Sequence, residues 1–347
     1  MREQLILLCR PGYEGDTAAE VQATTAALGV HGYCRAVTDS AEVRFHAAGP
    51  TPITDLWGAW RLDDHIFPRQ AFLGDAPVPL PEHDRVGAVL ARLGEQPVAD
   101  AVVENPDNEA GRAWTRLANA LTTPLQKGLE SRGFWRPDDP TAPRLHLLLT
   151  DDGATVGLMP ADADAPWPGG IPRLRRPGDA PSRSFLKLDE AWHVLLTPEE
   201  REAALQPGQQ AVDLGAAPGG WTWLLTRRHL RVTAVDNGPL AETVMATGLV
   251  DHVRADGFHY RPSRPVDWMV CDMVEKPHRV AALAADWLAE GHCRHAVVNL
   301  KLPMRQRYAT VRACLDDMAA TLGGNATLRA RHLYHDRDEI TVYAGYP

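Results

Sequence analysis

The chain has 347 residues, a formal net charge of −9 and 44% apolar residues, a composition that is ordinary for a globular protein of two or three domains. No apolar run reaches the roughly 18 residues that a membrane span needs, and no secretory leader is evident at the N-terminus. Five scattered cysteines without CxxC spacing argue against a disulfide framework or a zinc site and predict reduced thiols in a cytoplasmic protein.

The amino-terminal half of the chain predicts two small α+β units, one at residues 1–70 and the other at 75–160. The first is expected to contain a helix at 16–28 and strands at 5–9, 32–37 and 42–46. The second is expected to contain a helix at 85–93, a strand at 99–104 and a helical pattern at 111–133 that breaks near Pro124. Its apolar runs 145–150 and 155–158 flank Asp151-Asp152-Gly153, which predicts a β-hairpin.

A proline-rich stretch separates this half from the rest of the chain. The stretch from Pro160 to Pro181 holds six prolines, both ends included, and we therefore expect a linker or ordered loop at 161–181. Beyond it, apolar runs alternate with helical segments, at 211–214, 232–235, 266–271, 296–300 and 340–344. This alternation predicts an α/β domain over 182–347, a Rossmann-like parallel sheet with helices on both faces.

The most informative motif is the Gly-rich turn within residues 212–221, which follows the first of these strands. Glycine allows the backbone to come close to a ligand because no Cβ intervenes. Asp236 ends the next strand, where an acidic residue suits the hydroxyls of a bound ribose. The turn lacks GxGxxG spacing and a Lys-Ser/Thr pair, so a nucleoside site without a pyrophosphate clamp is indicated, which favours S-adenosylmethionine over NAD or ATP.

Charged residues lie at the ends of four predicted strands: Asp213, Asp236, Asp272 and Lys301. Ligands of such sheets bind beyond the carboxyl ends of the strands. One charge at a strand end is more often a solvated strand terminus. Four at one edge, beside a Gly-rich turn, favour a binding or catalytic site.

Two further ionisable residues have both a structural and a functional interpretation. Lys187 shares the apolar face of a helix predicted over 184–195, with Ser182 or Ser184 as its cap. It is either a snorkelling lysine at the rim of the core or a lysine aimed into a site. Glu339 enters a strand and could equally be an edge-strand charge.

Two lysines and two carboxylates around a methyl donor predict methylation of a ribose hydroxyl. The hydroxyl becomes a good nucleophile when a base removes its proton, and a lysine can do so only when its pKa falls from about 10.4 towards neutrality. Burial and a second cation nearby both lower a lysine pKa. No metal is required for this chemistry.

Arginine groups offer local positive charge despite the net acidity. Each group taken alone could be a solvated face, but phosphate contacts need only local charge. The candidate RNA contacts are Arg173, Arg175, Arg176, Arg183, Arg305 and Arg307, and a further group comprises Arg227, Arg228 and Arg231.

The carboxyl-terminal half resembles the FtsJ-like group of S-adenosylmethionine-dependent RNA ribose 2′-O-methyltransferases. In this half the matching motifs lie at residues 179–184 with Lys187, 212–221, 235–239, 256–258, 270–277, 299–304 and 333–337. A further motif at 8–14 extends the resemblance to the first strand of the amino half. The resemblance implies a Lys-Asp-Lys-Glu tetrad with Lys301 as the proton acceptor; the tetrad falls on Lys187, Asp272, Lys301 and Glu339. The residues expected at the cofactor are Ser184, Asp213, Gly215, Ala217, Pro218, Gly219, Gly220, Trp221, Asp236, Asp256 and Asp272.

The resemblance also implies a ferredoxin-like unit followed by a THUMP RNA-binding domain, in agreement with the two α+β units. The whole chain is similar to members that methylate the 2′-OH of a cytidine in 23S rRNA, and we expect a monomer that acts on precursor or protein-poor RNA. The alternatives are a 2′-O-methyltransferase of another RNA such as tRNA, and an inactive RNA-binding protein with a methyltransferase fold. An NAD-dependent oxidoreductase is disfavoured by the missing GxGxxG.

Overall fold

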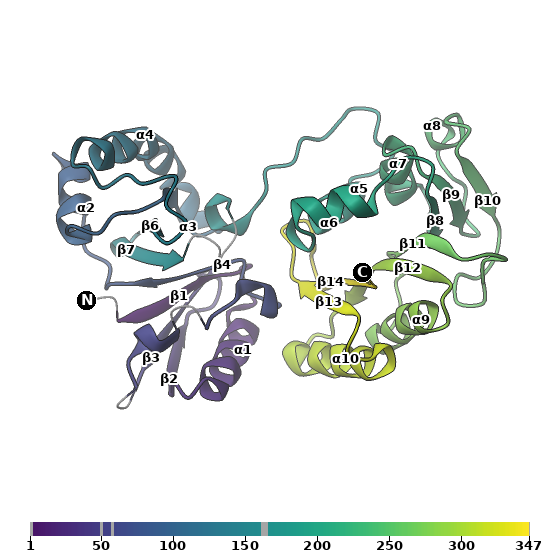
Figure 1. The fold of residues 1–347 in the computed structure, drawn as a ribbon, viewed down its shortest axis with the longest axis horizontal. Helices are drawn as coiled ribbons and strands as arrows, with labels where there is room; N and C mark the ends of the chain where they lie inside the picture. The colour runs from purple at the N-terminus through teal and green to yellow at the C-terminus, as the bar shows by residue number, and fades with distance from the viewer. Residues whose placement is uncertain (1–2, 49–50, 57–58, 161–165, 347) are drawn as a thin grey trace. The chain divides into compact units, whose positions relative to one another are not determined.

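The computed structural model describes residues 3–48, 51–56, 59–160 and 166–346. The chain forms two compact units, Met1–Ile171 and Pro172–Pro347, each with a seven-stranded sheet (Figure 1). Residues 161–165 of the predicted linker lie outside the described part of the chain. In the described ranges, no helix is both long and apolar enough to cross a membrane.

One sheet runs through the whole amino-terminal unit, in the order β2-β3-β1-β4-β7-β6-β5. The two α+β units suggested by the sequence therefore share this sheet, because β4 pairs with β7 through Leu73 and Leu158. The predicted hairpin is present as β6 and β7. The strands are β1 (Gln4–Leu8), β2 (Gly32–Ala36), β3 (Glu42–Ala47), β4 (Gln70–Gly74), β5 (Asp100–Glu104), β6 (Pro143–Thr150) and β7 (Gly153–Pro160).

Helices cover separate parts of this sheet (Figure 1). Helix α1 packs on β2 and β3, whereas α4 packs on β5 and α2 contacts α4 and β7. The helices are α1 (Glu14–Ala27), α2 (Arg85–Leu93), α3 (Glu109–Arg112) and α4 (Thr115–Ser131), with 3₁₀ turns at Ile53–Leu56, Leu62–Asp64 and Pro168–Gly170.

The prediction that the helical pattern breaks near Pro124 is wrong, because α4 continues through this residue. The chain is interrupted earlier, between α3 and α4. Within α4, Leu121, Leu125 and Leu129 are buried at helical spacing. Burial of this face outweighs the loss of one backbone hydrogen bond, since each leucine contributes about 1.5–3 kcal/mol.

The carboxyl-terminal sheet has the order β10-β9-β8-β11-β12-β14-β13. Its first five strands are parallel, as predicted, but β14 runs antiparallel to β12. The expectation that residues 340–344 join a parallel sheet is therefore wrong, and β10 and β13 were not foreseen because they are short and largely half-buried. The strands are β8 (Gln210–Leu214), β9 (Arg231–Val235), β10 (Val250–Val253), β11 (Val266–Cys271), β12 (Cys293–Lys301), β13 (Thr327–Arg331) and β14 (Glu339–Gly345).

Helices lie on both faces of this sheet, which makes the unit a three-layer, Rossmann-like α/β fold. Figure 1 shows α5, α6 and α7 on one face and α9 and α10 on the other. Thr197 and Glu200 start α6 with a reciprocal capping box. The helices are α5 (Phe185–Val194), α6 (Pro198–Ala204), α7 (Gly220–Arg227), α8 (Glu242–Met245), α9 (Pro277–Ala289) and α10 (Arg307–Leu322).

Candidate active site

Strand direction brings the candidate residues to one edge of the carboxyl-terminal sheet. Asp272 follows β11 and Lys301 ends β12, so both lie at the carboxyl edge of the parallel strands. Glu339 begins β14, and it reaches the same edge because β14 is antiparallel and pairs Glu339 directly with Lys301. A parallel strand would have placed this glutamate at the opposite edge.

The four residues of the expected tetrad are in direct contact. Lys187 Nζ lies 2.6 Å from Glu339 Oε1 and 3.1 Å from Asp272 Oδ2. Lys301 Nζ lies 2.7 Å from Glu339 Oε2 and 3.3 Å from Asp272 Oδ1. Each amine therefore bridges both carboxylates, and the two positive and two negative charges alternate around a closed ring.

The ring is partly shielded from solvent, with side-chain exposures between 8% for Glu339 and 23% for Lys301. Burial lowers the pKa of Lys187, but the carboxylates of Asp272 and Glu339 outweigh burial and raise it above its ordinary value. Burial raises the pKa of Glu339, but hydrogen bonds from Lys187 and Lys301 lower it overall. Lys187 is thus held as a cation between the two carboxylates.

Asp272 has a partner that was not assigned a role from the sequence. Asn299, in the middle of the buried strand β12, donates from Nδ2 to Asp272 Oδ1 at 2.8 Å. Asn299 is fully buried. An amide within the otherwise apolar run 296–300 was the signal that could have identified it, because buried polar groups need partners.

The Gly-rich turn is tightly packed against the start of α5 and the segment after β11. A Cβ on Gly215 would lie 2.5 Å from Met273, and one on Gly220 would lie 2.2 Å from the Ser184 hydroxyl. Trp221 Nε1 donates to the Ser184 carbonyl at 2.9 Å. The turn therefore depends on glycine at these two positions and is anchored to the helix that carries Lys187.

A cavity of about 570 Å³ opens beside this turn. Its size is in the range of small-molecule sites. Five of the residues expected at the cofactor line it: Gly215, Ala217, Asp236, Asp256 and Asp272. Further lining residues are Val235, Asn237, Ala255, Gly257, Phe258, Met273, Val274, Glu275 and Arg279. The other residues expected at the cofactor, all within the described part of the chain, do not line this cavity: Ser184, Asp213, Pro218, Gly219, Gly220 and Trp221.

Two carboxylates of the cavity also shape its wall. Asp236 accepts hydrogen bonds from the backbone N–H groups of Ala217 and Gly238 at 3.0 and 2.7 Å. Asp256 accepts from Phe258 N at 2.8 Å, and this bond lowers the pKa of Asp256. Both side chains keep further acceptor capacity, because a carboxylate offers about four lone-pair sites.

Asp213 lies beneath the turn instead of in the cavity. It is 1% exposed, and Thr222 of α7 donates to its Oδ2 at 2.6 Å. Burial raises its pKa to about 7. Asp213 therefore connects β8 to α7 and supports the turn from below.

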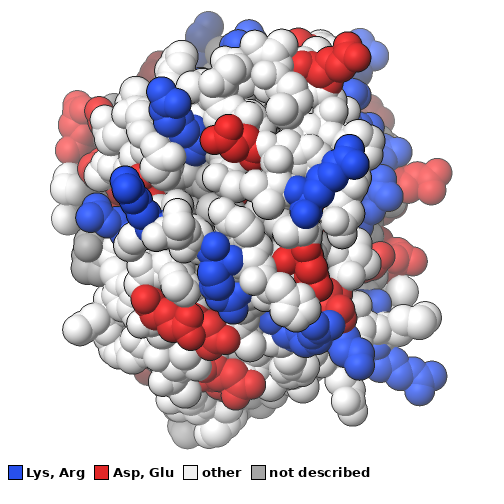
Figure 2. Space-filling view, turned by 90° about the vertical axis from the view of Figure 1, so that its right-hand side faces the viewer, with Lys and Arg blue, Asp and Glu red and all other residues white. Residues whose placement is uncertain are grey.

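The candidate RNA contacts lie largely at the surface, with Arg173, Arg175, Arg176, Arg183 and Arg305 exposed and Arg307 half-buried. On the face drawn in Figure 2, basic and acidic side chains are interspersed and do not form one field of a single sign. The Arg173 guanidinium lies 5.5 Å from the ring centroid of Tyr334, in the segment that leads to β14. Any phosphate contacts on this face would thus be made by local groups of arginines and not by one continuous basic surface.

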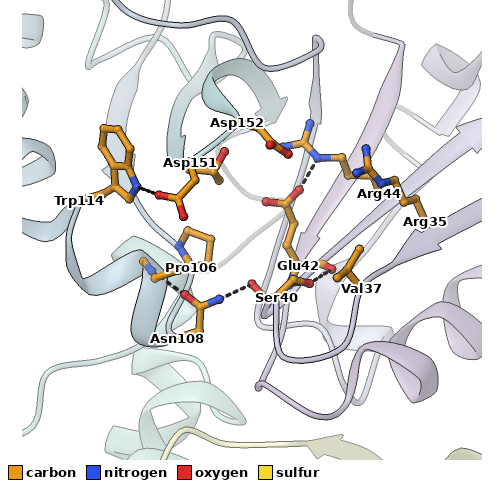
Figure 3. Close-up of a pocket in the computed structure, with 13 residues that line it drawn as sticks. Arg35, Val37, Ser40, Glu42, Arg44, Pro106, Asn108, Trp114, Asp151 and Asp152 are labelled. Atoms are coloured by element: carbon orange, nitrogen blue, oxygen red, sulfur yellow. Dashed lines mark hydrogen bonds and ion pairs between the residues drawn. The ribbon is translucent and has the colours of Figure 1, made fainter.

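A second cavity, of about 300 Å³, lies in the amino-terminal unit (Figure 3). Its charged groups have mixed signs and engage neighbours: Arg44 pairs with Glu42, and Trp114 Nε1 donates to Asp151 Oδ1 at 2.7 Å. The labelled side chains do not form a ring of alternating charges like the tetrad (Figure 3). The carboxyl-terminal edge is therefore the candidate active site.

Three family models match the chain. They are described as RlmM ferredoxin-like domain, at residues 1–72; Ribosomal RNA large subunit methyltransferase M, N-terminal, at residues 84–158; and FtsJ-like methyltransferase, at residues 180–303.

Relatives named ribosomal RNA large subunit methyltransferase M are similar over nearly their full length. The protein of Azotobacter vinelandii (strain DJ / ATCC BAA-1303) is 49% identical over 98% of this chain and 97% of the relative. That of Xanthomonas campestris pv. campestris (strain B100) is 48% identical over 98% of both chains. Among solved structures, a putative methyltransferase complexed with SAH matches at 12% identity with a TM-score of 0.34, over 99% of this chain and 98% of that chain, which is too distant to support an inference.

Proposed function

Because the chain belongs to the family of ribosomal RNA large subunit methyltransferases M, we propose that it methylates the 2′-hydroxyl of a cytidine ribose in 23S rRNA. The methyl donor is S-adenosylmethionine, as the match to FtsJ-like methyltransferases supports. A ribose hydroxyl as the acceptor of the methyl group is supported by one observation, the closed ring of Lys187, Asp272, Lys301 and Glu339. This ring suits proton removal from a weakly acidic oxygen next to a cationic donor.

The cavity beside the Gly-rich turn fits the donor. Gly215 and Gly257 lie directly against Met273, which lines the same cavity, and a Cβ at either position would crowd this wall residue. Asp236 and Asp256 offer acceptors for ribose hydroxyls, and Asp272 offers negative charge for a sulfonium. When bound, S-adenosylmethionine supplies an electrophilic methyl group on a positively charged sulfur.

We assign Lys301 as the base, because its side chain is 23% exposed against 16% for Lys187 and is therefore the more accessible of the two to an incoming hydroxyl. With S-adenosylmethionine bound, Lys301 in its neutral form would take the proton of the 2′-hydroxyl on Nζ. The bond between O2′ and the methyl carbon would form as the bond between that carbon and the donor sulfur breaks, which leaves a neutral thioether. Asp272 and Glu339 then hold the resulting ammonium, and Lys187 keeps both carboxylates in place. Alignment of this kind can supply up to roughly 7–11 kcal/mol of the barrier.

The amino-terminal unit is the candidate for RNA selection. We propose that it comprises the ferredoxin-like domain at 1–70 and a THUMP domain at 75–160, joined to the catalytic domain (182–347) by residues 161–181. Arginines 173, 175, 176, 183, 305 and 307 would contact phosphates near the active site. All four tetrad residues belong to one chain, which supports action as a monomer, and ribosomal RNA as substrate supports a cytoplasmic location.

The proposal is tested by deleting the gene and mapping ribose methylation across all stable RNAs. We expect one 2′-O-methylated cytidine in 23S rRNA to lose its mark and to regain it when the purified protein and S-adenosylmethionine are added to the unmodified RNA. Loss of a mark in tRNA, or methylation of a base instead of a ribose, would overturn the proposal.

A further inference from the structure

Behind the tetrad, three fully buried polar side chains form a continuous line: Asn299, Thr341 and Asp336. Asn299 lies on β12 and Thr341 directly opposite on β14, two residues inward from the Lys301 and Glu339 pair. Asp336 belongs to the segment just before β14. None of the three lines the cavity beside the turn.

We propose that Asn299 is a positioning residue for methyl transfer, held by a chain of hydrogen bonds from Asp336 through Thr341 so that its amide donates to Asp272. The inference rests on the proposed function, because it assigns a role in the chemistry of the tetrad. Asn299 makes this contact at 2.8 Å from a fully buried position, whereas Asp272 is 19% exposed.

The orientation of the Asn299 amide follows from its two neighbours. Asp272 Oδ1 already accepts hydrogen bonds from Lys187 and Lys301. The Asn299 group that faces this oxygen must therefore be the NH₂, which donates. The opposite orientation would place two oxygens 2.8 Å apart. The Asn299 carbonyl oxygen then faces Thr341, whose hydroxyl donates to it at 2.8 Å.

This assignment uses the single hydrogen of the Thr341 hydroxyl. Thr341 Oγ1 nevertheless lies 3.0 Å from both carboxyl oxygens of Asp336. The hydrogen of that contact must therefore come from Asp336, which has to carry a proton. Asp336 Oδ2 accepts from Leu333 N at 3.0 Å, which leaves Oδ1 as the protonated oxygen.

The surroundings of Asp336 agree with a neutral acid. Burial raises the pKa of Asp336 well above its ordinary value, and the negative charges of Glu339 and Glu190 raise it further. The hydrogen bonds then run in one direction, from the Asp336 acid to the Thr341 hydroxyl, from that hydroxyl to the Asn299 carbonyl, and from the Asn299 amide to Asp272.

The hydrogen bond from Asn299 fixes the position of Asp272. This position matters for methyl transfer because Asp272 contacts both lysines of the tetrad. When Asn299 can rotate, its oxygen can turn towards Asp272 and displace the carboxylate, and Lys301 moves with it. A misplacement of about 1 Å can cost about 100-fold in rate. Binding of the methyl donor should change less, since Asp272 is a single member of the cavity lining and the other lining residues keep their places.

The test compares two substitutions of Thr341. Thr341→Val keeps the shape but removes the hydroxyl, whereas Thr341→Ser keeps the hydroxyl. We expect Thr341→Val to lower the single-turnover rate of methyl transfer to 23S rRNA by about 10- to 100-fold per S-adenosylmethionine-binding site, with the Kd for S-adenosylmethionine changed less than about threefold. Thr341→Ser should recover most of the rate.

The matched control is Thr226→Val, which removes another buried hydroxyl, one that donates within α7 to the Trp223 carbonyl. If loss of a buried hydroxyl acted only through stability, both valine variants would lower the melting temperature while the rate per binding site stayed at the wild-type level. That result for Thr341→Val, or failure of Thr341→Ser to recover the rate, would overturn the inference.

Asp336 provides a second comparison. Asp336→Asn keeps a donor towards Thr341 and an acceptor for Leu333 N, whereas Asp336→Leu keeps neither. We expect the asparagine variant to transfer methyl at least about 10-fold faster than the leucine variant. Equal rates would contradict a protonated Asp336. If the wild-type protein methylates no ribose in 23S rRNA, the proposed function fails instead, and this outcome is separate from any difference among variants.

Discussion

The two units of the chain both bury ionisable side chains against a seven-stranded sheet, but they place them differently. In the amino-terminal unit, Glu104 and His146 pair at 2.8 Å within neighbouring strands, and both side chains are 0% exposed. In the carboxyl-terminal unit, the tetrad meets at the ends of strands and keeps some exposure, 23% for Lys301. The first arrangement stabilises a core, and the second leaves a charged ring within reach of a substrate.

Strand direction accounts for the difference. In the amino-terminal sheet most neighbouring strands are antiparallel, so consecutive strand ends alternate between opposite edges. In the carboxyl-terminal sheet, β10, β9, β8, β11 and β12 are parallel, and residues that follow them collect at one edge. A mainly parallel sheet therefore gathers the polar residues that follow its strands at one edge. A mainly antiparallel sheet of the same size divides them between two edges.

The largest expected effect is that of Lys301→Ala in the carboxyl-terminal unit. Removal of the base should lower kcat by about 10²- to 10⁴-fold while the Kd for S-adenosylmethionine stays nearly constant. Titration calorimetry and a methyl-transfer assay measure the two quantities. Lys127→Ala, on the exposed face of α4, is the matched control and should keep the wild-type kcat. Loss of cofactor binding together with activity would contradict the assignment of the base.

The next largest effect concerns the buried carboxyl beneath the turn. The pKa of Asp213 is about 7 in the folded protein and about 3.8 when exposed, so the folded state holds a proton that the unfolded state releases. Its contribution to stability is complete below pH 4 and is lost as pH rises through about 7, on the order of 4 kcal/mol. Relative to Asp213→Asn, the wild type should lose stability over this window in urea unfolding.

The control for this pH dependence is Asp152→Asn in the amino-terminal unit, which changes an exposed aspartate. It should leave the slope of stability against pH at its wild-type value. If the curves of unfolding free energy against pH are parallel for Asp213→Asn and the wild type between pH 4 and 7, Asp213 is ionised in the folded protein. That result would contradict the prediction.

A smaller effect is expected from joint replacement of Arg173, Arg175 and Arg176 by alanine. Each lost phosphate contact should lower the salt dependence of RNA binding by about 0.7–0.9 in slope, and affinity at low salt should fall by about 10- to 100-fold. Filter binding over a range of salt concentrations measures both. An unchanged slope would exclude these arginines as phosphate contacts.

The matched control removes the arginines at positions 227, 228 and 231 instead. Two of them lie over tryptophan rings, Arg227 at 5.8 Å from the Trp223 centroid and Arg228 at 5.9 Å from that of Trp192. A guanidinium over an aromatic face is attracted to the ring, so these two side chains have partners within the carboxyl-terminal unit. We expect this variant to keep the wild-type salt slope, even if its melting temperature falls.

The smallest expected effect is that of Pro124→Ala in the amino-terminal unit. It restores a backbone donor inside α4 at an exposed position, and we expect a gain of about 1–2 kcal/mol in the free energy of unfolding of this unit. Differential scanning calorimetry measures it. The Kd for S-adenosylmethionine should not change, and a change would indicate that the two units are energetically coupled.

Much of the candidate active site was predictable from local sequence. The Gly-rich turn, the strands at 211–214, 232–235 and 266–271, and the charges that follow them are encoded in short apolar runs and turn residues. Lys187 was recognisable as a lysine on an apolar helix face. The shared amino-terminal sheet was not predictable in this way, because the pairing of Leu73 with Leu158 joins residues that are far apart in the chain.

By itself, the sequence determined which residues could carry the chemistry, because apolar periodicity and glycine spacing are local properties. The tertiary structure alone decided which of the distant polar residues meet. The antiparallel direction of β14 brought Glu339 to Lys301, and pairing across β12 and β14 set Asn299 against Thr341. Strand direction and cross-strand register depend on contacts between distant segments, which no single stretch of sequence specifies.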